Sequence, residues 1–71
     1  MKLPRDLSGQ GVAKALRRLG FQVEHQEGSH LRLSNGARRV TIPLHSALLP
    51  KTLQSVLKQA GITIEELMRV L

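Results

Sequence analysis

One stretch limits the fold more than any other: the residues from Gly28 to Gly36 read as a β-strand that runs into a hairpin turn. Leu31 and Leu33 alternate with polar residues, so they are expected on one face of the strand and the polar side chains on the other. Asn35-Gly36 is a strong hairpin signal, because both residues tolerate the positive φ of a type I′ turn. This strand is therefore expected to pair with residues 38–42.

The polar face of this strand carries groups that can act on a phosphate ester. His30 and Arg32 are neighbours there, and Arg39 and Thr41 of the following strand are expected to share the face. An imidazole can move a proton near neutral pH, and a guanidinium can hold a phosphate. From spacing alone, an ordinary exposed strand histidine remains the alternative interpretation of His30.

The charge of the chain indicates its class of partner. The 71 residues include 11 lysines and arginines against 5 acidic residues, a net charge of +6. A polyanion is the expected partner, with nucleic acid first and an acidic protein second. A chain of this length allows one domain over residues 1–71 and no large cofactor cavity.

Several classes of protein are excluded by what the sequence lacks. It has no cysteine and only three scattered histidines, so we expect neither a metal site nor a cofactor. Its apolar runs are short, and residues 1–5 lack the apolar core of a signal peptide. We therefore expect a cytoplasmic protein without a membrane span.

Helices are expected before and after the strands along the chain. Ser8 is a good N-cap for a helix over residues 9–19, and a second helix is expected to begin at Pro50 and end at Gly61. A capping box at Thr63 predicts a short third helix that runs to the C-terminus. Its apolar stripe either packs on the domain or is offered to a partner.

A first strand is expected from Phe21 to Glu27, because the apolar period changes there from helical to alternating. Phe21 and Val23 are expected to face the core. His25 has the same parity, so we expect it at the end of the apolar face in a structural role. Glu27-Gly28 is expected to form the turn into the central strand.

The predicted order is helix, three-stranded antiparallel sheet, helix, with an extra short C-terminal helix. This is an α+β fold of the double-stranded-RNA-binding kind, with helices on one face of the sheet and the other face open. Such a topology does not by itself give a function.

Short motifs along the chain point further. The motifs are Gly28-Ser29-His30, Pro43-Leu44-His45, Lys51-Thr52-Leu53 and Leu57-Lys58-Gln59-Ala60-Gly61-Ile62. Together they resemble, in order and spacing, the HicA family, the small toxins of HicA/HicB toxin and antitoxin pairs, and the resemblance runs from about Ser8 to Ile62.

The resemblance implies a metal-independent endoribonuclease that cuts messenger RNA and is silenced by a HicB antitoxin. The catalytic histidine of the family maps onto His30. The second histidine of the pattern maps onto His45, which is either a second acid or base or a loop residue that ties down backbone. The role of residues 63–71 cannot be carried over, because the shortest family members end before them.

Candidate RNA-binding cations lie on several elements. For Arg17 and Arg18, a solvated helix face is an equally good interpretation. Because tryptophan and tyrosine are absent, base-specific reading of single strands should be weak. The candidate RNA-binding cations are Arg17, Arg18, Arg32, Arg39 and Lys51.

A non-catalytic RNA- or DNA-binding module and an adaptor for an acidic protein remain as alternatives to the ribonuclease.

Overall fold

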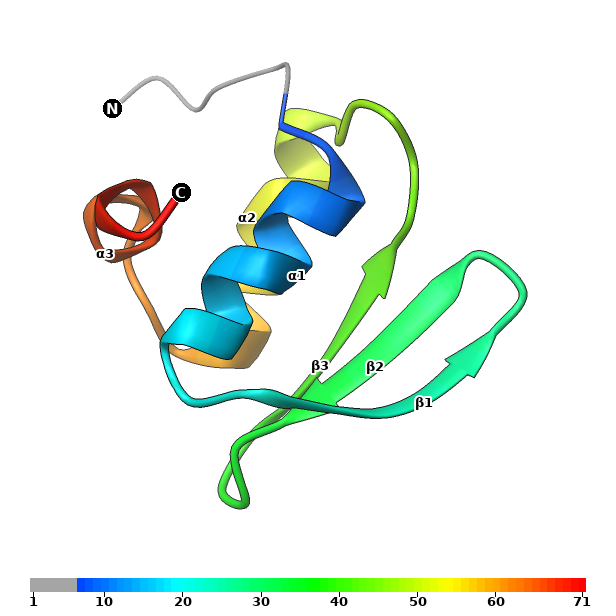
Figure 1. The fold of residues 1–71 in the computed structure, drawn as a ribbon. Coiled ribbons are helices and arrows are strands. Elements are labelled where there is room, and N and C mark those ends of the chain that lie inside the picture. The colour runs from blue at the N-terminus through cyan, green and yellow to red at the C-terminus, as the bar shows by residue number, and fades with distance from the viewer. Residues whose placement is uncertain (1–6) are drawn as a thin grey trace.

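The computed structural model describes residues 7–71, and the N-terminal stretch for which the sequence predicts no signal peptide lies outside them. Two long helices cover one face of a three-stranded sheet, and a short third helix packs beside the first (Figure 1). The elements are α1 (Gly9–Arg18), β1 (Gln22–Glu27), β2 (His30–Ser34), β3 (Arg39–Pro43), α2 (Pro50–Ala60) and α3 (Ile64–Arg69). The predicted α+β order is confirmed.

The helix boundaries follow from the predicted caps. The Ser8 hydroxyl accepts a hydrogen bond from the Gly11 N–H at 3.0 Å, which starts α1. Thr63 and Glu66 form the expected capping box at the start of α3, each side chain accepting from the other's backbone N–H. Gly61 ends α2 in the left-handed conformation.

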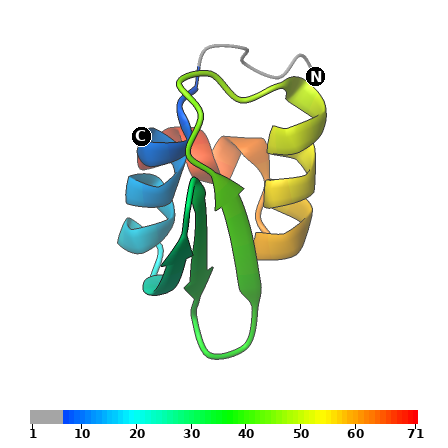
Figure 2. The same ribbon diagram turned by 90° about the vertical axis from the view of Figure 1, so that its right-hand side faces the viewer.

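The sheet is antiparallel with β2 in the centre, and Leu31 and Leu33 on β2 are buried as expected. Val40 and Ile42 of β3 are fully buried on the same side, against α1 and α2. Turned by 90°, the molecule presents the sheet in front of these two helices, so the other face of the sheet is open (Figure 2).

The hairpin between β2 and β3 is present, but its turn differs from the expected type I′ form. Asn35 does not adopt positive φ, and the loop has four residues, because Ser34 pairs with Arg39. Instead, the Asn35 side-chain oxygen accepts hydrogen bonds from the N–H groups of Ala37 and Arg38 at 2.9 and 2.7 Å. An Asx-type turn thus replaces the two-residue turn.

The expectation that His25 lies on the apolar face is wrong. A β-bulge interrupts β1, so that Val23 pairs with Leu33 but His25 pairs with Arg32. The extra residue reverses the facing of the strand beyond it and turns His25 to the open face. Val23 remains on the helix side of the sheet, although 46% of it is exposed at this edge.

The C-terminal helix is packed on the domain rather than held apart from it. Leu67 is fully buried and Ile64 nearly so, and the Arg18 guanidinium donates to the Val70 carbonyl at 2.6 Å. Met68 and Leu71 are about half exposed. Within residues 7–71, no helix has both the length and the apolar character needed to cross a membrane.

Candidate active site

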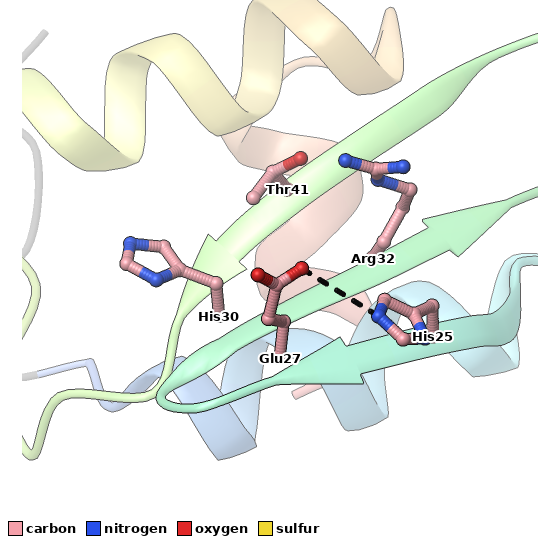
Figure 3. A pocket seen from close by; sticks show the side chains of 5 residues that line it. All are labelled: His25, Glu27, His30, Arg32 and Thr41. Atoms are coloured by element: carbon pink, nitrogen blue, oxygen red, sulfur yellow. Dashed lines mark ion pairs between the residues drawn. The ribbon is translucent and has the colours of Figure 1, made fainter.

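The open face of the sheet contains a shallow pocket at the end where β1 turns into β2. Figure 3 shows the pocket with the helices behind the sheet. Its side chains come from all three strands: His25 and Glu27 from β1, His30 and Arg32 from β2, and Thr41 from β3. The predicted neighbours His30 and Arg32 are therefore confirmed as parts of one surface.

His30 is the first residue of β2, where the backbone is fixed from both sides. It pairs with Glu27 on β1 and with Pro43 on β3. Immediately before it, the Ser29 carbonyl accepts a hydrogen bond from the Leu44 N–H at 2.6 Å. The imidazole itself is exposed, so its position rests on the backbone of three elements while its ring remains free to meet a ligand.

His25 and Glu27 add two groups that the sequence analysis did not place here. The His25 Nε2 atom lies 3.7 Å from the Glu27 Oε2 atom, and their side chains are 61% and 88% exposed. This contact is an ion pair only when the imidazole is protonated. The pocket thus combines two imidazoles, a carboxylate and a guanidinium.

Thr41 is held at the pocket by the helix behind the sheet. Its backbone N–H points away from β2 and donates to the Gln59 Oε1 atom of α2 at 3.0 Å. Gln59 in turn donates to the Ser55 hydroxyl at 3.2 Å. The outer edge of β3 is therefore closed at this position, and the pocket side chains stand on a fixed strand.

The residues that line the pocket do not form a metal centre. No group of three or more histidine or acidic side chains suited to a metal ion occurs among residues 7–71. The pocket instead offers proton-transfer groups beside a cation, an arrangement suited to a phosphate ester.

Residues 9–62 match the family model of the HicA toxin of bacterial toxin-antitoxin systems. This match covers 54 of the 71 residues and includes the whole pocket. The chain belongs to the HicA toxin family. The HicA match begins with α1 and ends just after α2, so that α3 lies outside it. A search of curated proteins finds no match.

The second histidine of the HicA pattern is not among the residues that line the pocket. His45 is exposed on the segment between β3 and α2, and its backbone carbonyl accepts a hydrogen bond from the Gly9 N–H at 2.9 Å. Within the described chain, its imidazole makes no hydrogen bond. The main chain of His45, rather than its ring, ties this segment to α1.

The predicted RNA-binding cations are spread over both layers of the HicA fold. Arg32 lines the pocket, and Arg39 lies on the same face, where its Nε atom is 3.6 Å from the Glu24 Oε1 atom. Arg17 and Arg18 lie on α1, which covers the opposite face of the sheet. Lys51 is exposed in the first turn of α2.

Proposed function

We propose that this HicA family member is a metal-independent endoribonuclease, an mRNA interferase, whose catalytic centre is the pocket around His30. The observation that carries the proposal is the placing of an exposed imidazole beside a guanidinium on an open surface. Toxins of this family act as ribonucleases in general, which the match to the family supports.

RNA needs little from such a site, because it carries its own nucleophile, the 2′-hydroxyl. A base must take the proton of that hydroxyl, an acid must protonate the departing 5′-oxygen, and cations must stabilise the charge on the phosphorane. His30 can take or give a proton, and Arg32 can bind the phosphate oxygens. A shallow surface open to solvent is enough to admit an RNA strand.

The partner proposed with this activity is a HicB-like antitoxin in the same cytoplasm as the mRNA. A net charge of +6 favours an acidic partner surface. If that surface covers His30 and Arg32, it excludes the substrate at the same time. The partner should be a small acidic protein encoded in the neighbouring reading frame.

The proposal predicts cleavage of RNA without any metal ion. We expect the purified protein to cut a long messenger RNA in excess EDTA and to leave a 2′,3′-cyclic phosphate or 3′-phosphate and a 5′-hydroxyl. End-group analysis of the fragments measures this outcome, and addition of the antitoxin should stop it. If the protein binds RNA without cutting it, it is a non-catalytic RNA-binding module. If it neither binds nor cuts RNA, it is an adaptor for an acidic protein.

A second prediction separates a pocket cation from general charge. Replacing Arg32 with glutamine should weaken RNA binding and reduce the slope of log affinity against log salt by about one, as expected for one lost phosphate contact. Arg69→Gln removes the same charge from α3, which lies on the side of the helices away from the sheet, and serves as the matched control. Titrations at several salt concentrations compare the two variants. Equal losses would show that only net charge matters.

A further inference from the structure

We propose that His25 is a second catalytic histidine, the general acid that protonates the leaving 5′-oxygen, and that Glu27 positions it. The inference rests on the proposed ribonuclease function and deepens it. It assigns to His25 the role of second acid or base for which the sequence alone suggested His45.

The bulge in β1 is what makes this arrangement possible. Without an extra residue, His25 would face the helices together with Val23. With it, His25 stands opposite Arg32, and His30 stands opposite Glu27. His25 and His30 are therefore diagonal neighbours on one face, a relation that places side-chain attachment points about 7–8 Å apart. A phosphodiester that bridges the two imidazoles would lie over the Glu27 side chain, which stands between them (Figure 3).

Glu27 favours the acid role for His25 over the base role. Its carboxylate lies 3.7 Å from the His25 Nε2 atom, and the two side chains form an ion pair when the imidazole is protonated. Figure 3 shows the Glu27 side chain directed toward His25, whereas the His30 ring is turned away from it. The carboxylate beside His25 is the ground on which we assign the acid role to His25 and the base role to His30.

The reaction balances with these groups alone. His30 takes the proton of the 2′-hydroxyl while the 2′-oxygen forms a bond to phosphorus. The bond from phosphorus to the 5′-oxygen breaks, and the proton of His25 goes to that oxygen. Arg32 stabilises the added charge on the phosphate oxygens. The products are a 2′,3′-cyclic phosphate and a 5′-hydroxyl.

His45 fits the acid role less well. Its ring is absent from the pocket lining, and the segment that carries it is attached through main-chain contacts of His45 and Leu44. The contrast between His25 and His45 gives the test its matched control, since both are exposed histidines on a fixed backbone.

The test measures single-turnover cleavage of two substrates by the parent, His25→Ala, His25→Gln and His45→Ala. On ordinary RNA we expect the two His25 variants to lose about a hundredfold in rate, as for the loss of a general acid, and His45→Ala to keep the parent rate. The second substrate carries a 5′-bridging sulfur, whose thiolate leaves without a proton. On it, both His25 variants should approach the parent rate.

Glu27→Gln tests the positioning role in the same assay. Its cleavage rate on ordinary RNA should fall by less than that of the His25 variants, and it should regain the parent rate on the sulfur substrate. A merely structural role would give equal losses on both substrates.

The outcomes separate this inference from the proposed function. A parent that leaves RNA uncut overturns both. A parent that cuts, with His25 variants that cut equally well or that remain slow on the sulfur substrate, overturns the inference alone. A loss confined to His45→Ala would return the acid role to His45. Because the His25 side chain is 61% exposed, its removal leaves no cavity, and circular dichroism of each variant verifies the fold.

Discussion

A His30→Ala variant is expected to be folded, to bind RNA and to have lost its cleavage activity. His30 is exposed on the face of β2 that points away from the buried Leu31 and Leu33, so its removal costs no core volume. The free energy of unfolding should change by about 0.5 kcal/mol or less, as for surface substitutions generally. The cleavage rate should fall by about a hundredfold to ten-thousandfold, because a proton-transfer group is lost.

Thermal unfolding, RNA affinity and the cleavage rate should be measured together for this variant. His45→Ala provides the control, because it removes the same side chain from the neighbouring segment. His30→Ala should also remain slow on the substrate with the 5′-bridging sulfur, because its missing step is removal of a proton rather than donation of one. Undiminished cleavage by His30→Ala would refute the mechanism, and inactivity that came from unfolding would give His30 a structural role.

Much of the fold can be predicted from the sequence because its signals are local. The Ser8 cap and the capping box at Thr63 each require only a few neighbouring residues, and both are found where the residues predict them. The alternation of Leu31 and Leu33 with polar residues likewise fixes which face of β2 is buried. That face, in turn, places His30 and Arg32 on the open surface.

The composition of the pocket was harder to predict because it depends on two constraints that meet in β1. Val23 must face the helices, whereas the two-residue turn at Gly28-Ser29 sets Glu27 opposite His30 on the open face. Residues 23 and 27 have the same parity, so a regular strand cannot satisfy both. One extra residue resolves the conflict, and the resulting bulge brings His25 into the pocket.

The sequence indicates this bulge only if the turn between the two strands is placed correctly. The expected turn at Glu27-Gly28 lies one residue before the observed one. With that turn, regular alternation from Val23 places His25 on the apolar face, and no bulge is required. A turn at Gly28-Ser29, combined with an apolar Val23 and a polar His30, would have required an irregularity in between. Strand parity is reliable only between two points whose facing is known independently.

The largest loss of stability that we expect from a glycine substitution is at Gly9, the first residue of α1. A Cβ atom there would overlap the Pro43 carbonyl oxygen and lie 2.9 Å from the Leu44 Cα atom. Both are backbone atoms, so no side chain can rotate away to make room. Gly9 also donates its N–H to the His45 carbonyl at 2.9 Å, which holds α1 against the segment that follows β3.

Gly9→Ala should therefore destabilise the fold by about 1–3 kcal/mol or more, as overpacking does. That is a large share of the stability of a 71-residue domain, which is on the order of 4–10 kcal/mol. Chemical denaturation measures the loss. Gly11→Ala is the matched control in the same turn, where the added Cβ meets only the Ser8 hydroxyl, at 3.1 Å.

The consequence should extend from stability to the site. The segment displaced by a side chain at Gly9 includes Leu44, whose N–H donates to the Ser29 carbonyl directly before His30. Cleavage by Gly9→Ala should thus fall even at temperatures where the variant is still folded, whereas Gly11→Ala should cleave like the parent. If Gly9→Ala matches the parent in both stability and cleavage, the contact between α1 and the end of β3 does not hold the backbone of β2 at His30.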